Sequence, residues 1–191
     1  MEYPVSDSQR RSAAFVTFYP VLLVAMACLG NWVVFGVKPL QVGLPSNFSL
    51  AIMTISAVLM CLNHTWLMTV TELTRVRFHI QTTPEEWSDS SVARDEIPQK
   101  GWDELARARN AHRNCTENSV YFVMLGIPLM FCSANDIVSV WLLEFALGRL
   151  GHTYGYLYKS DVLRGLFMSI SLLAMYGMAA YLLMSTLMLL F

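Results

Sequence analysis

Apolar residues are gathered into five long stretches that are separated by short polar segments. A membrane-spanning α-helix needs about 20 predominantly apolar residues, and four of the stretches meet this length directly. The remaining one meets it only when its polar N-terminal approach is included. We therefore predict five transmembrane helices, at residues 16–37, 48–70, 103–132, 137–156 and 163–191.

The third predicted helix has an unusual composition. Its apolar part, SVYFVMLGIPLMFC, has only 14 residues and follows the polar segment RARNAHRNCTEN. If this helix spans the bilayer, Asn110, Asn114 and Glu117 lie at membrane depth, close together on one face. Polar and ionisable residues are costly at that depth, so this face is a candidate functional site.

Composition excludes several classes of protein. Hydrophobic residues make up 55% of the 191 residues and charged residues only 14%, more apolar surface than a soluble chain of this size could bury. We expect a single all-helical integral membrane domain. The net charge of −1 and the lack of a basic–aromatic patch argue against nucleic-acid binding. The four cysteines form no CxxC pair, so neither a metal site nor a disulfide framework is expected.

Charge placement predicts the topology. With five spans, all of the 13 basic residues except Lys38 lie nearest one side, which we expect to face the cytoplasm or the mitochondrial matrix. If the first stretch did not span, Arg10 and Arg11 would move to the other side. We interpret the first stretch as a signal anchor. The endoplasmic reticulum is the expected location, and a mitochondrial membrane is the alternative.

One sizeable loop, at residues 78–102, separates the second and third predicted helices. Pro84, Pro98 and Gly101 interrupt it, and serine and aspartate are frequent, so we expect a solvated connector. Trp87 and Trp102 are candidates for anchoring it at the membrane interface.

Polar side chains recur at helical spacing on several of the predicted helices. Arg149, His152 and Tyr156 follow an i, i+3, i+7 pattern and therefore share one face of the fourth helix. By the predicted topology, this face lies in the cytoplasmic half of the membrane. The same level also receives residues from three other helices: Arg75, Arg107, Asn110, Arg113, Asn114, Glu117 and Arg164.

These side chains suggest a particular kind of ligand. Several guanidinium groups favour carboxylates or phosphates, and Glu117 can pair with an ammonium group. A small zwitterionic peptide with extra carboxylates fits, and a nearby arginine would lower a thiol pKa from about 8.5. The alternatives are structural: Arg75 as a positive-inside anchor, Arg113, Asn114 and Glu117 as an interhelical network, and His152 and Tyr156 as packing residues.

Three segments resemble a known family. ARARNAHRNCTENSVYF resembles the second-helix signature of the MAPEG superfamily, the membrane-associated proteins in eicosanoid and glutathione metabolism. GRLGHTYGYLYKSDVLRG and LTRVRFHIQTTPEEW resemble two further regions of that family. Together these segments extend the resemblance over about residues 48–191. Microsomal glutathione S-transferase and microsomal prostaglandin E synthase are the members that this chain resembles most.

The resemblance implies a homotrimer of four-helix bundles that binds glutathione between neighbouring protomers near the cytoplasmic side. Arg164 matches the arginine that stabilises the glutathione thiolate, and Arg149 matches a structural or catalytic arginine. The remaining matched positions are glutathione contacts: Arg75, Arg113, Asn114, Glu117, His152 and Tyr156.

The chain also departs from the family pattern at four positions. Asn110 replaces an arginine before Ala-His, and Asn63 replaces a lysine of the family's first helix. Gly165 replaces the serine that is associated with prostaglandin E synthase, and Glu86 replaces an aspartate. These departures weaken a prostaglandin synthase assignment, and Asn110 also weakens glutathione binding.

The first predicted helix, at residues 16–37, has no counterpart in the four-helix family pattern. We therefore divide the chain into residues 1–47, with a tail, an extra helix and a short loop, and residues 48–191, a MAPEG-like four-helix membrane domain. The extra helix could wrap the bundle or dock another membrane protein.

The resemblance and the departures from it lead to two hypotheses about function. The leading hypothesis is a glutathione-dependent membrane transferase or peroxidase that acts on hydrophobic small-molecule electrophiles entering from the lipid bilayer. The alternative is a MAPEG-fold protein without catalysis, acting as a scaffold or as an accessory subunit of a larger membrane complex. The extra helix and Asn110 favour the second hypothesis, and the other retained residues favour the first.

Overall fold

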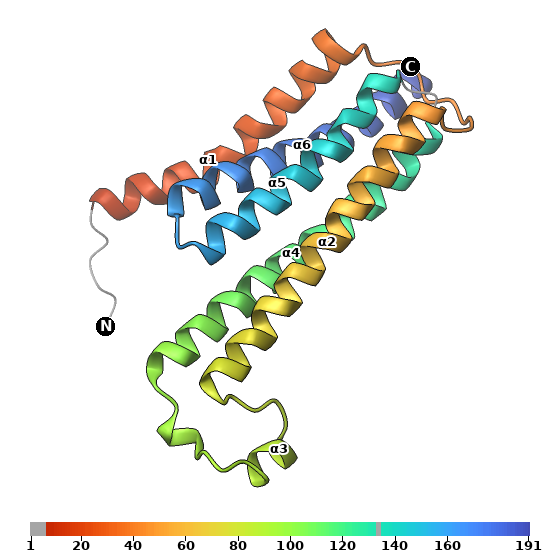
Figure 1. Ribbon diagram of the computed structural model, residues 1–191. Helices are drawn as coiled ribbons and strands as arrows, with labels where there is room; N and C mark the ends of the chain where they lie inside the picture. The colour runs from red at the N-terminus through yellow and green to blue at the C-terminus, as the bar shows by residue number, and fades with distance from the viewer. Residues whose placement is uncertain (1–6, 133–134) are drawn as a thin grey trace.

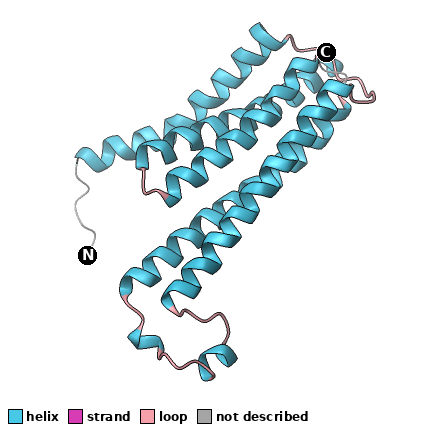
Figure 2. Ribbon diagram, in the orientation of Figure 1, coloured by secondary structure: helices cyan, strands magenta, loops and turns pink. Residues whose placement is uncertain are grey.

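The structure is a computed structural model that describes residues 7–132 and 135–191. Figures 1 and 2 show that every regular element in these two ranges is a helix. The described residues contain one isolated antiparallel bridge, between Val42 and Cys132. The part of the predicted tail at residues 1–6 lies outside the described residues.

Five long helices form the molecule, and three short ones occur in the connections. The long helices include α1, which continues into a π-helical segment, η1. Their bounds are α1 Asp7–Gly30, η1 Asn31–Phe35, α2 Asn47–Phe78, α4 Gln99–Phe131, α5 Val140–Leu157 and α6 Asp161–Leu190. The short helices are α3 Pro84–Ser88, η2 Arg94–Glu96 and η3 Asp136–Ser139.

The predicted all-α membrane bundle is confirmed, with longer helices than expected at some ends. α2 continues past residue 70 to Phe78, and α4 begins at Gln99 rather than at residue 103. Three segments are long and apolar enough to cross a membrane by composition alone: Arg10–Phe35, Asn47–Phe78 and Asp161–Leu190. α4 and α5 fall short of that apolarity because they contribute most of the polar residues described below.

Helices α2, α4, α5 and α6 pack around a common core. Phe122 of α4 stacks on Phe145 of α5 with ring centroids 4.7 Å apart, and both are buried. On α2 and α4, the rings of His64 and His112 meet with Nδ1 and Nε2 3.0 Å apart. In a bilayer, such side-chain packing and hydrogen bonding replace the hydrophobic effect as the force that holds helices together.

Glycines allow α5 and α6 to approach closely. A Cβ atom added at Gly155 would lie 2.6 Å from the backbone nitrogen of Arg164, and one added at Gly148 would lie 2.8 Å from that of Ser171. Both obstructions are backbone atoms, which cannot rotate away. Small residues at these positions therefore set the distance between the two helices.

We predict that Gly155→Ala destabilises the protein by about 1–3 kcal/mol, because α5 and α6 must separate to admit the methyl group. Gly165→Ala is the matched control. Gly165 has open space around its Cα, so the same change there should stabilise α6 by about 0.5–1 kcal/mol. Thermal unfolding of both variants in detergent measures the difference. Equal effects at the two sites would contradict the close approach.

A buried amide adds polar contacts to the packing of α1 on the bundle. Asn31, fully buried in η1, donates from Nδ2 to the carbonyl of Gly177 in α6 at 2.8 Å. Its Oδ1 accepts a hydrogen bond from Trp141 Nε1 of α5 at 3.0 Å. The following loop is held too, because Ser185 Oγ donates to the carbonyl of Lys38 at 2.6 Å. α1 therefore lies along α6, as Figure 1 shows.

Replacing the amide should loosen α1 selectively. In Asn31→Leu the indole N–H of Trp141 stays buried without a partner, at a cost of about 1–3 kcal/mol. We expect faster hydrogen–deuterium exchange of the α1 amides and little change in α4. Trp32→Leu is the control, since Trp32 is adjacent and exposed. Unchanged exchange in Asn31→Leu would show that packing and lipid contacts hold α1 without the amide.

The connector between α2 and α4 is folded. Ile80, Ile97 and Leu105 form a small buried core, and Trp87 stacks on Trp102 with ring centroids 6.4 Å apart. The connector is therefore more ordered than the solvated connector that the sequence predicts. The predicted anchoring of the two tryptophans at the interface stays a prediction.

Part of the α2–α4 pair extends beyond the membrane. The helices have 32 and 33 residues, whereas about 20 residues cross the hydrocarbon layer. Figure 1 shows this pair continuing past the turn between α5 and α6. The molecule is thus a four-helix section with an added α1, prolonged on one side by a two-helix projection that carries the folded connector.

Candidate functional site

A buried guanidinium lies at the centre of the four-helix section. Arg149 of α5 has no exposed surface, and its Nη2 donates to Asn114 Oδ1 of α4 at 2.6 Å. The same nitrogen is 3.5 Å from His152 Nδ1, and Nη1 is 3.6 Å from Met168 Sδ of α6. One side chain therefore links α4, α5 and α6.

A second contact brings α2 to this cluster. Asn63 Nδ2 donates to Sγ of Cys115 at 3.1 Å, and Cys115 is adjacent in sequence to Asn114. Asn63 Oδ1 and Arg149 Nε are buried without a hydrogen-bond partner. The sequence predicted no role for Cys115 and identified Asn63 only as a departure from the family pattern. Its amide inside the largely apolar stretch 48–70 was the signal that could have placed Asn63 here.

The partners of the buried guanidinium are neutral. Among the described residues, Arg149 forms no ion pair with a carboxylate. Burying a cation is costly unless hydrogen bonds and opposite charge compensate it. Asn114 and His152 supply hydrogen-bonding atoms, and the net positive charge remains available to an anionic group nearby.

Tyr156 and Arg164 continue the cluster toward the turn between α5 and α6. The Tyr156 ring lies 5.4 Å from the His152 ring, and the Arg164 guanidinium lies 5.2 Å from the centroid of the Tyr156 ring. Arg164 Nη2 is 3.2 Å from Asp161 Oδ1 at the start of α6. Since Arg164 is only half-buried, its guanidinium can reach a ligand.

Arg113 and Glu117 lie on a different face of α4. Their side chains are 73% and 63% exposed, and Arg113 Nε is 3.9 Å from Glu117 Oε1. Two residues correspond to about 200° around a helix, so Arg113 points away from the buried Cys115. Arg113 Nη2 also donates to Asn110 Oδ1 at 3.3 Å. A shallow hollow of about 320 Å³ lies along this face.

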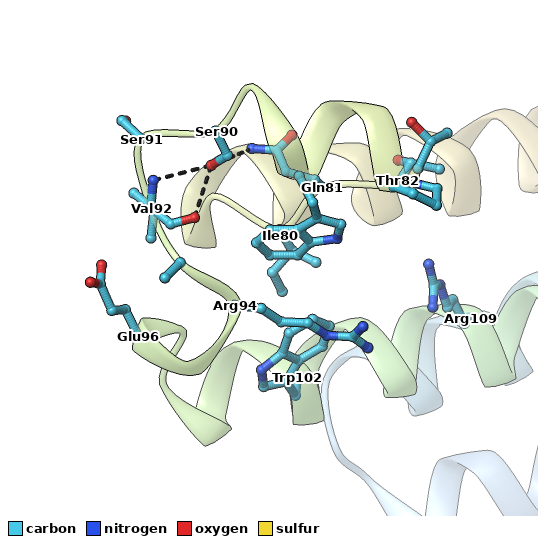
Figure 3. A pocket seen from close by; sticks show the side chains of 14 residues that line it. Ile80, Gln81, Thr82, Ser90, Ser91, Val92, Arg94, Glu96, Trp102 and Arg109 are labelled. Atoms are coloured by element: carbon cyan, nitrogen blue, oxygen red, sulfur yellow. Dashed lines mark hydrogen bonds between the residues drawn. The ribbon is translucent and has the colours of Figure 1, made fainter.

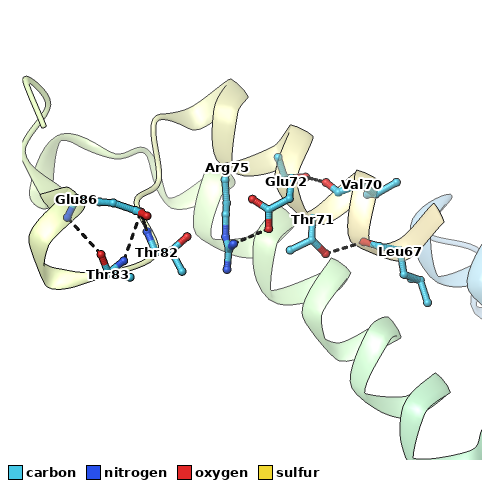
Figure 4. Close-up of polar contacts among 9 residues, drawn as sticks. Leu67, Val70, Thr71, Glu72, Arg75, Thr82, Thr83 and Glu86 are labelled. Carbon is cyan, nitrogen blue, oxygen red and sulfur yellow. Dashed lines mark hydrogen bonds and ion pairs between the residues drawn. The ribbon is translucent and has the colours of Figure 1, made fainter. Parts of the chain in front are cut away.

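Arg75 is separate from both groups. Figure 4 shows it at the end of α2, where its Nη1 is 2.6 Å from Glu72 Oε1. Its side chain is 15% exposed, and its Nε is buried without a partner. Arg75 lines a hollow of about 420 Å³ that also includes His79 and Glu86.

A further hollow, of about 750 Å³, belongs to the folded connector (Figure 3). Trp87 and Trp102 line it, together with Arg94, whose guanidinium lies 5.4 Å from the centroid of a Trp102 ring, and with Arg109. None of the eight predicted site residues lines this hollow. It is therefore distinct from the site that the sequence predicts.

Comparison with profiles of known protein families shows to which family this chain belongs. The profile of the MAPEG family matches residues 53–184, which is more than half of the chain. The chain belongs to the MAPEG family. Searches of curated proteins and of solved structures give no significant match. The family includes glutathione-dependent transferases.

The matched range agrees with the placement of the polar residues in this MAPEG protein. It begins inside α2 and ends inside α6, so it contains all eight predicted site residues and leaves α1 outside. Within one chain, the structure brings together Asn114, Arg149, His152, Tyr156 and Arg164. It does not bring Arg113, Glu117 or Arg75 to them.

We predict that Asn114→Ala destabilises this MAPEG protein by about 1.5–3 kcal/mol, because it removes a hydrogen bond from a buried charged group. Asn118→Ala is the control, since Asn118 donates only to a carbonyl of its own helix. The double variant Asn114→Leu/Arg149→Leu should recover part of the loss, because the buried charge is gone. Thermal unfolding tests all three. A loss in Asn114→Ala no larger than in the control would contradict the central role of Arg149.

Proposed function

We propose that this MAPEG protein is a glutathione-dependent membrane transferase or peroxidase that acts on hydrophobic electrophiles. The observation that carries the proposal is the row of neighbouring polar and aromatic side chains from the Arg149–Asn114 pair through His152 and Tyr156 to Arg164. Such a row is costly inside a membrane helix bundle and therefore favours a functional role. It leads from the buried cluster to a half-exposed guanidinium.

The chemistry of the side chains fits glutathione, which has two carboxylates, an ammonium group and a thiol. Arg113 and Arg75 are suited to carboxylates, and Glu117 is suited to the ammonium group. Arg75 lines a hollow of about 420 Å³ at the end of α2, where its guanidinium would meet a carboxylate. When bound, glutathione supplies the nucleophilic thiol.

The distribution of these residues favours a site between chains. Arg113 and Glu117 are exposed on α4, and the hollow beside them includes neither Tyr156 nor Arg164. A neighbouring chain that packs against this face of α4 would bring its own Arg164 to Arg113. We propose a homotrimer in which each site combines residues of two protomers.

The residues of the chain have separate roles in the proposed mechanism. Arg164 provides positive charge where a thiol must lose its proton, and this charge favours the thiolate. The Tyr156 ring beneath the guanidinium holds Arg164 in place. Arg149 acts as a positioning residue, because it fixes Asn114 and His152 and thereby the faces of α4 and α5. The electrophile would enter from the lipid, and the endoplasmic reticulum is the proposed location.

A second candidate function is a non-catalytic scaffold or an accessory subunit of a membrane complex. The contact between Arg113 and Asn110 favours it, because Arg113 is already engaged by a residue that replaces the family's arginine. The added α1, with its largely exposed apolar surface, also favours it as a contact for another membrane protein. This function requires no glutathione binding.

Calorimetric titration of glutathione into the detergent-purified protein distinguishes the two functions. We expect glutathione to bind, and its dissociation constant to rise tenfold or more in Arg113→Ala. This change corresponds to the free energy of about one charge-assisted hydrogen bond. Arg94→Ala, in the connector hollow, is the control and should bind as the parent does.

Ultraviolet absorbance of the thiolate gives the second measurement. In Arg164→Ala glutathione should still bind, but its thiol pKa should return toward about 8.5, so the thiolate signal appears only at higher pH. No binding at millimolar glutathione would sink the enzymatic proposal and leave the scaffold.

A further inference from the structure

A groove separate from the proposed glutathione site lies where the four-helix section ends. It has a volume of about 270 Å³ and lies between α2, α4 and the turn that joins α5 to α6. We call it the interface groove. The residues that line it include Trp66, Val70, Glu104, Arg107, Tyr158 and Lys159.

The interface groove lies at the boundary of the hydrocarbon layer. If the hydrocarbon layer begins at the first residue of α2, Asn47, Trp66 lies 19 residues further along, or roughly 29 Å at 1.5 Å per residue. This distance matches a hydrocarbon thickness of about 30 Å. Trp66 and Tyr158 are also the residue types that are enriched at membrane–water interfaces. Figure 1 shows α2 and α4 continuing beyond this level while α5 turns back.

The groove carries uncompensated positive charge. Within the described residues, neither Arg107 nor Lys159 forms an ion pair, and Arg107 Nε is buried without a hydrogen-bond partner. Glu104, the acidic residue of the groove, lies 3.6 Å from Arg77 Nη1 outside it. The groove therefore presents two cationic groups and no free carboxylate.

Lys159 occupies a backbone position that favours glycine. Its φ is +59°, and the bonds Ser160 N–H to Gly155 carbonyl at 2.9 Å and Lys159 N–H to Tyr156 carbonyl at 3.4 Å form a Schellman motif at the end of α5. Glycine is the usual residue at this left-handed position. A lysine there places a cation at the groove in spite of an unfavourable conformation.

We propose that the interface groove binds the headgroup of an anionic phospholipid from the leaflet on the basic side of the membrane. Arg107 and Lys159 contact the phosphate, because paired basic residues between helices at this level match an anionic headgroup. Trp66, at the boundary of the hydrocarbon layer, lies against the upper part of the acyl chains. The proposal is independent of glutathione, since none of the proposed glutathione residues lines the groove.

The test uses the full-length protein in an uncharged detergent, titrated with dioleoyl phosphatidylglycerol or dioleoyl phosphatidylcholine and followed by native mass spectrometry. We expect preferential binding of phosphatidylglycerol. Arg107→Gln/Lys159→Gln should weaken it tenfold or more, in line with the contribution of two basic residues near an anionic lipid. Lys100→Gln/Arg109→Gln removes the same charge elsewhere on α4 and should leave the affinity unchanged. Equal losses in the two double variants would overturn the proposal.

Lys159→Gly separates lipid binding from folding. Because glycine fits the left-handed position better, the melting temperature should rise while phosphatidylglycerol binding weakens. A purely structural role for Lys159 predicts no weakening. Unchanged lipid affinity in Lys159→Gly and in Arg107→Gln/Lys159→Gln would therefore contradict the proposal.

Two competition results identify the occupant. Millimolar inorganic phosphate should leave phosphatidylglycerol bound, since the acyl chains contribute to binding. Displacement by phosphate would mean that the groove recognises a free anion rather than a lipid. A change in oligomeric mass in Arg107→Gln/Lys159→Gln, with lipid binding intact, would assign the groove to a second copy of the chain.

Discussion

The buried guanidinium of Arg149 is the constraint on which the rest of the structure depends. A cation without exposed surface has to be surrounded by polar groups. Here His152 comes from α5 itself, Asn114 from α4 and Met168 from α6. These contacts fix how the helices are rotated about their axes. Rotating α4 by a quarter turn would move Asn114 away and leave the guanidinium unpaired, at a cost of several kcal/mol.

The polar face of α5 could be predicted from the sequence, because helical spacing places Arg149, His152 and Tyr156 together whatever the surrounding packing. The long apolar stretches likewise predicted the five helices and their approximate ends. Spacing along one helix, however, says nothing about which neighbouring residue faces it. The contact between Asn63 and Cys115 and the attachment of α1 through Asn31 join residues 52 and 146 positions apart, and only the packing of the helices determines them. The core of the connector depends in the same way on Ile80 and Ile97 meeting Leu105.

The division of the predicted site has a physical origin in α4. Residues that face the bundle on this helix, such as Ala111 and Cys115, alternate around the axis with Arg113 and Glu117, which face outward. A helix cannot direct both sets to one interior. A chain that retains both sets therefore fits best with a neighbour that covers the outer face, and that neighbour would supply Arg164. In this arrangement α1, which lies along α6, has to leave the outer face of α4 free.

The most direct test of this account is complementation between two defective chains. Arg113→Ala and Arg164→Ala carry different tags and are co-expressed, and the mixed oligomers are isolated through both tags. A site between chains predicts that the mixed oligomers regain part of the glutathione thiolate absorbance at neutral pH, because some sites combine an intact Arg113 from one chain with an intact Arg164 from another. Mixed oligomers that form but show no more thiolate absorbance than either variant alone would contradict a shared site.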